Sequence, residues 1–228
     1  CSVLMPGSEK EISSLVERHM RKGYKGMKLG WGALGQSIEN DVMLAKCARQ
    51  CLGNDKKLML DIGMIWKDVK TAKQTCDEFE KLNVYWVEEP FSPDNLEAYQ
   101  FLRNNTSLRI AAGEEVTTVY EFNELLANKC VDVLQPDLSR CGGITIARKI
   151  NDLANMHLIP IVPHAFKSGI LMAATLHFIA SVKNADFLEY CEQETVLSTH
   201  LIHEHFKPDK NGEILIPDLP GLGIELNE

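Results

Sequence analysis

Apolar and polar positions follow two kinds of pattern along the chain. Short apolar runs of strand type are separated by longer stretches in which apolar residues return every three or four positions, as on one face of a helix. In 9–20, Ile12, Leu15, Val16 and Met20 lie on one such face, and Ser8 with Glu11 predicts an N-cap before it. Further helices are predicted over 39–51, 69–82, 96–104, 120–127, 144–155 and 169–181.

Eight strand-type runs alternate with these helices, over 3–5, 24–29, 57–62, 84–87, 108–112, 131–134, 158–162 and 187–190. Regular strand–helix alternation is typical of parallel βαβ units, and eight units favour a (β/α)8-type TIM barrel over an open doubly wound sheet. No linker or shift of composition divides the chain. We therefore expect an α/β protein with a single barrel domain over 1–228, in which 191–228 forms an irregular C-terminal tail.

Composition narrows the classes of function. The 228 residues are 45% hydrophobic, enough for a buried core, and their formal net charge of −8 argues against a nucleic-acid partner. No apolar run reaches the ~18–20 residues that cross a bilayer, so no membrane partner is expected. The seven cysteines lack paired spacing, which predicts free thiols in a reducing compartment and a cytoplasmic location.

Polar residues stand at or just after the ends of seven predicted strands. They recur at steps of 23 to 33 residues, about one βα unit each: Lys28, Asp61, Glu88, Glu114, Asp137, His164 and Glu189. In a parallel barrel the carboxyl ends of all strands meet at one rim, where catalytic groups gather. We expect these side chains to converge although they are far apart in sequence.

Three of these residues, Asp61, Glu88 and Glu114, are carboxylates on consecutive strands. Like charges repel at close range, and a hard divalent cation removes that repulsion. Ligation by oxygen alone suits Mg²⁺, whereas zinc prefers cysteine or histidine. The alternative for each acid is an ion pair with a neighbouring lysine or a cap on the following helix. The pattern favours Mg²⁺ as the cofactor.

Asp137 and His164 end two neighbouring strands. A carboxylate beside an imidazole orients the ring and favours proton uptake, which suits a general base. The alternative is a hydrogen-bonded core histidine without a catalytic role. Lys28 is expected across the rim, where it serves either as an acid or base or simply as an ion-pair partner of the carboxylates.

Taken in order, the motifs resemble the enolase superfamily. The residues are Lys28 in Met-Lys-Leu-Gly (27–30), Asp61, Trp-Val-Glu-Glu-Pro (86–90) and Ala-Gly-Glu (112–114). Four further stretches, 135–137, 163–165, 188–189 and 216–223, resemble its mandelate racemase subgroup. Details of 27–32, 113–115, 136–140 and 163–166 are most similar to galactarate-type acid-sugar dehydratases. The resemblance covers essentially the whole chain.

The resemblance implies a mechanism. Mg²⁺ on the three carboxylates holds the substrate carboxylate, the Asp137–His164 dyad removes the proton α to it, and an enediolate forms. Lys28 matches the second lysine of the family's Lys-x-Lys pair. Glu189 matches a hydrogen-bond partner of the substrate carboxylate or the enediolate.

The favoured function is a lyase that dehydrates an acid sugar, a hexarate or aldonate, to a 2-keto-3-deoxy acid. One alternative is an isomerase of the same superfamily: a racemase or epimerase with Lys28 and His164 on opposite faces, or a sugar-lactone cycloisomerase. Another is a barrel fragment or metal-binding module without catalysis. The sequence leaves open the sugar, its stereochemistry and whether the protein is a homo-oligomer.

Several features depart from the family pattern. Gly26 stands at the first lysine position, and Lys25 is displaced to the other strand face. Gly63 replaces a polar residue often found two positions after the metal-binding Asp. The chain starts at Cys1, so we expect the N-terminal capping domain to be absent here and present in the full-length protein; activity without it is left open.

Two further signals are interpreted without a ligand. The G-x-G-x-x-G pattern at 30–35 is read as a mobile active-site loop, because the helical pattern begins only after Ser37 and a dinucleotide site needs a helix starting within the glycines. The three tryptophans, Trp31, Trp66 and Trp86, are interpreted as core or rim packing.

Overall fold

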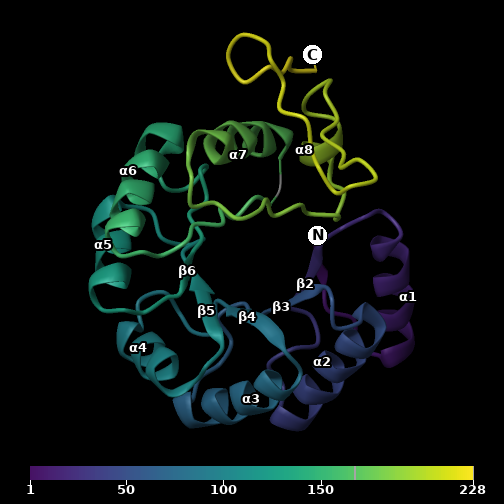
Figure 1. Cartoon of the computed structure of the whole chain (residues 1–228), viewed down its shortest axis with the longest axis vertical. Helices are drawn as coiled ribbons and strands as arrows, with labels where there is room; N and C mark the ends of the chain where they lie inside the picture. Colours follow the sequence, from purple (N-terminus) through teal and green to yellow (C-terminus); the bar gives the residue numbers. More distant parts are fainter. Residues whose placement is uncertain (167, 228) are drawn as a thin grey trace. The chain divides into compact units, whose positions relative to one another are not determined.

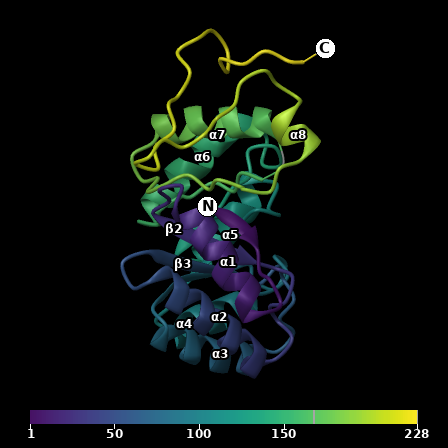
Figure 2. The ribbon, with the colours of Figure 1, turned by 90° about the vertical axis from the view of Figure 1, so that its right-hand side faces the viewer.

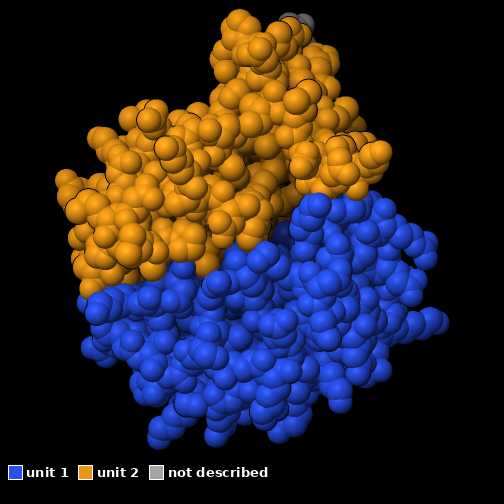
Figure 3. Space-filling model, viewed as in Figure 1, with its two compact units in different colours: residues 1–112, 128–132 blue, residues 113–127, 133–228 orange. Residues whose placement is uncertain are grey.

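The structure, a computed structural model, describes residues 1–166 and 168–227; residue 228 of the predicted tail lies outside them. The chain divides into two compact units, coloured separately in Figure 3. Unit 1 comprises Cys1–Ala112 and Asn128–Asp132, and unit 2 comprises Gly113–Ala127 and Val133–Glu228. The single domain expected over 1–228 stays a prediction, and the two units are described in turn.

Strands and helices alternate in unit 1. Its elements are β1 (Ser2–Leu4), α1 (Glu9–Met20), β2 (Gly26–Gly30), α2 (Ile38–Leu52), β3 (Lys57–Asp61), α3 (Val69–Lys81), β4 (Val84–Glu88), α4 (Leu96–Asn105) and β5 (Arg109–Ala112). Each strand pairs in parallel with the next one along the chain. The helices α1 to α4 pack side by side and cover one face of the strands (Figures 1 and 2). This is the predicted alternation, with ends within about two residues of those expected.

Each helix of unit 1 begins at a polar cap. The side chains of Ser8, Ser37, Asp68 and Asn95 each accept a hydrogen bond from the backbone N–H three residues later. Such caps satisfy amide groups that have no partner inside the helix. The predicted cap at Ser8 is confirmed. The cap at Ser37 places the start of α2 beyond the glycines of 30–35, as the sequence indicated.

The strand register places two carboxylates side by side. Gly30 pairs with Asp61, Asp61 with Glu88, and Glu88 with Ala111 across β2, β3, β4 and β5. Side chains of register partners lie on the same face of a sheet. The small residues Gly30 and Ala111 therefore flank the two acids and leave space around them.

Unit 2 is mainly helical. Its elements are α5 (Val119–Ala127), β6 (Val133–Leu134), α6 (Gly143–Met156), α7 (Gly169–Ser181) and α8 (Val196–Thr199). Helices α5, α6, α7 and α8 pack in sequence order. The four-residue α8 was not predicted; it begins with a capping box between Thr195 and Ser198. Beyond α8 the described tail has no helix or strand, apart from a bridge between Ile202 and Leu226 (Figure 1).

The strands predicted over 158–162 and 187–190 do not form as such in the described residues. Ile161 makes single parallel bridges to Leu134 and to Ala185, and no longer ladder is present there. Pro160 and Pro163 flank this bridge, and proline has no N–H to donate to a neighbouring strand. Leu158 adopts a φ of 57°, outside the strand region. The segment before His164 is thus extended but only sparsely hydrogen-bonded.

Among the described residues, no helix combines the length and apolar character that crossing a membrane requires. All seven cysteines are free thiols, as their spacing predicted.

Candidate active site

In unit 1, Asp61 and Glu88 form a pair of buried carboxylates. Each is the last residue of its strand, β3 or β4, and the two are register partners. One oxygen of Asp61 lies within 4.8 Å of one oxygen of Glu88. The Asp61 side chain occupies the space beside Gly30, where a Cβ would lie 2.9 Å from Asp61 Oδ2. The absence of a side chain at position 30 therefore lets Asp61 turn toward Glu88.

Lys28 brings a positive charge to these acids. Its ammonium donates a hydrogen bond to Glu88 Oε1 and lies 3.7 Å from Asp61 Oδ2. All three side chains are buried. Buried charges are costly unless paired, so the ammonium offsets part of the repulsion between the carboxylates. With all three groups ionised, two negative charges face one positive charge, and the remaining negative charge favours a bound cation.

Two further donors fix the carboxylates. The indole Nε1 of Trp86 donates to Glu88 Oε2 at 2.9 Å, and the backbone N–H of Gly63 donates to Asp61 Oδ1 at 3.0 Å. Trp86 was interpreted from the sequence as packing only. The sequence does carry a signal for this hydrogen bond. Trp86 precedes Glu88 by two residues on the same strand face, and a buried indole N–H needs an acceptor.

The lysine pair of the family is represented by Lys28 alone. Lys25 is exposed and precedes β2, so its displacement from the strand face is confirmed. At Gly26 a Cβ would approach the Cβ and carbonyl oxygen of Lys57 to 2.8 Å, which leaves no room for a lysine without movement of β3.

In unit 2, His164 is held between two carboxylates. Its Nδ1 lies 2.7 Å from Asp137 Oδ2, and its Nε2 lies 3.2 Å from Glu114 Oε2. Both acids and the ring are buried. Both ionised carboxylates can only accept hydrogen bonds, and the shorter, hydrogen-bonded contact with Asp137 favours the proton of a neutral ring on Nδ1. Nε2 is then the nitrogen that can accept a proton.

Asp137 remains ionised because several donors reach it. Burial by itself would raise the pKa of Asp137, but the hydrogen bonds from His164 and from Ser139 outweigh burial and hold that pKa below its usual value. Ser139 donates to Asp137 Oδ1 through its backbone N–H at 2.7 Å and through its hydroxyl at 2.5 Å. Near neutral pH, Asp137 is therefore a carboxylate that accepts the hydrogen bond from His164 Nδ1 and so orients the ring.

Arg140 fixes the position of Glu114. Its Nη1 donates to the backbone carbonyl of Glu114 at 2.9 Å and to Glu115 Oε1 at 2.6 Å, and lies 3.7 Å from Glu114 Oε1. No role was predicted for Arg140 from the sequence. A contact between residues 26 positions apart has no local signal in the sequence.

Glu189 lies next to the histidine segment. Its Oε2 accepts a hydrogen bond from the backbone N–H of Ala165 at 3.1 Å. The structure thus brings Lys28, Asp61 and Glu88 together within unit 1. Within unit 2 it brings Glu114, Asp137 and His164 together, and it links Glu189 to this group through the residue after His164.

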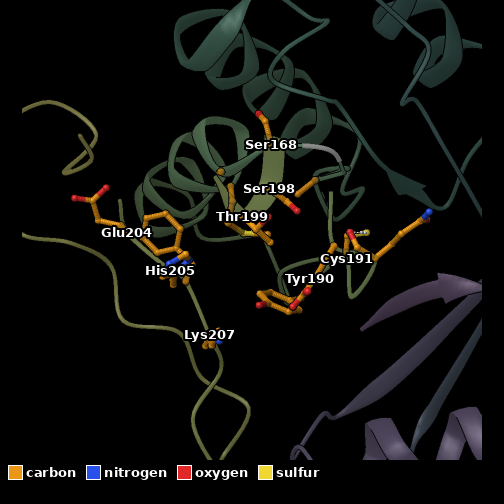
Figure 4. A pocket seen from close by; sticks show the side chains of 14 residues that line it. Ser168, Tyr190, Cys191, Ser198, Thr199, Glu204, His205 and Lys207 are labelled. Carbon is orange, nitrogen blue, oxygen red and sulfur yellow. Dashed lines mark hydrogen bonds between the residues drawn. The ribbon is translucent and has the colours of Figure 1, made fainter. Parts of the chain in front are cut away.

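A separate pocket of about 90 Å³ opens beside Ala165 and Tyr190 in unit 2 (Figure 4). Its wall mixes apolar surface with hydroxyl groups from the start of α7 and from α8, and with charged side chains from the tail. The labelled lining residues are Ser168, Tyr190, Cys191, Ser198, Thr199, Glu204, His205 and Lys207. Acidic and basic groups are both present, so the lining does not select a ligand of one charge.

Comparison with known proteins identifies relatives over nearly the whole chain. The sequence profile of the family described as enolase C-terminal domain-like matches residues 11–228. Arabinonate dehydratase of Saccharolobus solfataricus is 30% identical over 92% of this chain and 55% of its own length.

Solved structures agree with this assignment. The 3,6-anhydro-D-galactonate cycloisomerase of Zobellia galactanivorans superposes with a TM-score of 0.90 at 30% identity, over 99% of this chain and 62% of that one. A racemase of Streptomyces coelicolor A3(2) with bound magnesium superposes with a TM-score of 0.82 at 25% identity, over 96% of this chain and 57% of that one. These similarities confirm the predicted barrel class of fold. The chain spans about half the length of the curated relatives it matches.

Proposed function

The chain belongs to the enolase C-terminal domain-like family. We therefore propose that it carries the metal ligands and the general base of an enzyme that acts on acid sugars. The reaction begins with removal of the proton α to the substrate carboxylate, and its favoured outcome is loss of water. Two relatives are named for sugar acids, an arabinonate dehydratase and a 3,6-anhydro-D-galactonate cycloisomerase. The family and these names support the class of substrate.

We propose that Asp61, Glu88 and Glu114 ligate Mg²⁺. The side chains offer only carboxylate oxygens, the donors that Mg²⁺ prefers, and Asp61 and Glu88 are buried neighbours. Glu114 follows β5 by two residues along the chain, as the third acid in the series. When bound, Mg²⁺ supplies the positive charge that polarises the substrate carboxylate and stabilises the negative charge developing there.

The observation that carries the proposal is the environment of His164. Asp137 holds Nδ1, so Nε2 is the atom that accepts the α-proton. When the substrate carries a hydroxyl on the next carbon, the protonated ring returns that proton to the hydroxyl as the C–O bond breaks. Water leaves, and the enol that remains tautomerises to a 2-keto-3-deoxy acid. All atoms of the acid sugar are thereby accounted for, without an oxidant or reductant.

Lys28 and Glu189 complete the proposed site. The buried Lys28 ammonium, paired with Glu88, contributes positive charge beside Asp61 and Glu88. Glu189, held by the Ala165 amide, is the proposed hydrogen-bond partner of the substrate carboxylate or of the enediolate.

The second candidate is racemisation, epimerisation or cycloisomerisation. The observation that favours it is the place of Lys28, whose ammonium is buried beside Asp61 and Glu88 and is a second group that can deliver a proton there. In such a reaction the carbanion is reprotonated or attacked within the same molecule, and no water is lost.

The test uses the full-length protein, Mg²⁺ and a panel of hexarates and aldonates. Formation of 2-keto acid supports dehydration. Incorporation of solvent deuterium at the α-carbon without keto acid supports the second candidate. Binding of Mg²⁺ without exchange or turnover on any acid contradicts both and leaves a metal-binding module.

Two variants test the roles of residues. His164→Asn should abolish deuterium exchange while Mg²⁺ affinity stays within about twofold, and Glu88→Gln should reduce Mg²⁺ affinity at least about tenfold. His157→Asn, an exposed histidine after α6, is the matched control and should change neither quantity. Exchange at the wild-type rate in His164→Asn would refute the base assignment.

A further inference from the structure

The loop after β2 holds a tryptophan in a backbone conformation that bulky residues rarely adopt. Trp31 has a φ of 53°, in the left-handed region. Such conformations are energetically costly and persist where the surrounding structure imposes them, often at functional sites. Trp31 immediately follows Gly30, the register partner of Asp61.

Hydrogen bonds fix this loop at both ends. The backbone N–H of Trp31 donates to the carbonyl oxygen of Asp61 at 3.0 Å. At the far end, the N–H of Gly35 donates to Asp41 Oδ1 at 2.8 Å, and Asp41 is buried in α2. The loop predicted to be mobile is therefore tied both to the end of β3 and to α2.

The indole ring lies directly over the backbone that follows Asp61. A Cβ built on Gly63 would lie 2.2 Å from Trp31 Cδ1 and 2.8 Å from its Nε1. The same Gly63 has a φ of 62°, and its N–H donates to Asp61 Oδ1. The glycine at this position, where the family often has a polar residue, is thus explained: any side chain would displace the indole.

Trp31 is also distinguished by its exposure. Trp66 and Trp86 are 7% and 2% exposed, whereas Trp31 is only partly buried. A large apolar ring kept partly open to solvent beside charged groups is typical of a ligand site lined by aromatic residues.

We propose that Trp31 is a specificity-determining residue whose indole packs against the carbon chain of the sugar acid, beyond the carboxylate bound near Asp61. This inference rests on the proposed function. The C–H groups of a sugar acid form apolar faces that an indole ring can cover, while the hydroxyls stay available to polar groups. Asp61 fixes the backbone of Trp31, and Gly63 lies against the indole, so the ring keeps a constant distance from the substrate carboxylate. Trp31 thereby selects substrates by the shape of their carbon chain.

The test compares Trp31→Ala and Trp31→Phe in the full-length protein, with D-galactonate and galactarate as probes. We expect Trp31→Ala to raise KM at least about tenfold with kcat within about threefold, and Trp31→Phe to recover part of the loss. Mg²⁺ affinity should stay within about twofold, because the hydrogen bond from Trp31 to Asp61 is made by its backbone N–H and is kept in both variants. Tyr120→Ala, an exposed aromatic on α5, is the matched control and should leave KM unchanged.

A double-mutant cycle links the ring to Gly63. Gly63→Ala alone should raise KM because the methyl group displaces the indole, whereas in the Trp31→Ala background it should add less than about twofold. A purely structural effect of Gly63 would be equal in both backgrounds and would contradict the proposal.

A binding readout separates this inference from the proposed function. With three tryptophans in the chain, saturation with either probe should change the intrinsic fluorescence, and Trp31→Phe should lose that change. Turnover of the probes with KM of Trp31→Ala equal to wild type would overturn the role of Trp31 alone. If the wild-type protein neither binds nor converts either probe, the inference and the acid-sugar assignment fail together.

Discussion

Gly30 and Asp61 face each other across β2 and β3 so closely that a Cβ on Gly30 would lie 2.7 Å from the Cβ of Asp61. The glycine therefore sets the direction of the Asp61 carboxylate. We predict that Gly30→Ala lowers Mg²⁺ affinity at least about tenfold and the free energy of unfolding by about 1–3 kcal/mol, as overpacking does. Calorimetric Mg²⁺ titration and urea unfolding measure the two effects.

Gly7→Ala is the control for that change. A Cβ on Gly7 would lie 4.0 Å from the Cβ of Ala33, an ordinary van der Waals contact. Mg²⁺ affinity equal to wild type in both glycine variants would show that Asp61 does not bind the metal or adjusts without loss.

Lys28 is buried against Glu88 and Asp61, so its removal leaves two carboxylates without their ammonium partner. We predict that Lys28→Met lowers the free energy of unfolding of the metal-free protein by roughly 3 kcal/mol, the lower end for breaking a buried ion pair. Added Mg²⁺ should stabilise the variant more than the wild type, because it then binds a more negative site. Urea unfolding with EDTA or with Mg²⁺ tests both points.

Lys46→Met, on the exposed face of α2, is the matched control and should alter neither stability nor the Mg²⁺ response. An equal gain from Mg²⁺ in Lys28→Met and wild type would argue against a cation beside these carboxylates.

Asp137 gives the protein a defined acid dependence. Burial would raise its pKa, but hydrogen bonds from His164 and Ser139 bring the pKa below the ordinary 3.8. A carboxyl group with a depressed pKa stabilises the folded state above its unfolded value, and this contribution is lost as pH falls through the folded pKa. The stability difference between wild type and Asp137→Asn should therefore be full above pH 3.8 and shrink below it.

Urea unfolding from about pH 3 to about pH 6 measures this difference. A difference that is independent of pH would mean that Asp137 loses no charge in this window, or that the asparagine variant is destabilised by packing alone.

Arg140 is expected to act on the metal through Glu114. Arg140→Ala removes the donor to the Glu114 carbonyl and to Glu115, so Glu114 is less well positioned. We predict a loss of Mg²⁺ affinity of about tenfold, typical of residues that orient ligands, with partial recovery in Arg140→Lys. Arg148→Ala, exposed on α6, should have no effect, and an equal loss in both arginine variants would point to general electrostatics.

Much of the fold could be predicted because its pattern is local. Helices α1 to α6 are marked by periodicity, α7 by a nearly continuous apolar run and several of them by polar caps, and the acids at positions 61 and 88 end apolar strands. Parallel strands bring such ends to one edge, so the neighbourhood of Asp61 and Glu88 follows from their place in sequence.

What could not be predicted depends on contacts across the chain or on elements too short to show a period. Lys28 meets Glu88 across 60 positions, and no local pattern reveals whether Lys28 pairs or stays free. The four residues of α8 are too few for a helical repeat. The apolar run at 158–162 predicts a strand, but only single bridges form there. Pro160 lies within the run and has no N–H to donate to a neighbouring strand.

The contrast between the ladder of unit 1 and the single bridges at Ile161 has an evolutionary consequence. Asp61 and Glu88 are fixed by strand register, so a substitution nearby disturbs several strands at once. His164 follows a buried segment that pairs only through single bridges, so its position depends on the side chains packed around Ile161 and Val162 more than on strand register. Exchange of those side chains can shift the base while register keeps Asp61 and Glu88 in place, so new reactions should arise by changes around the base.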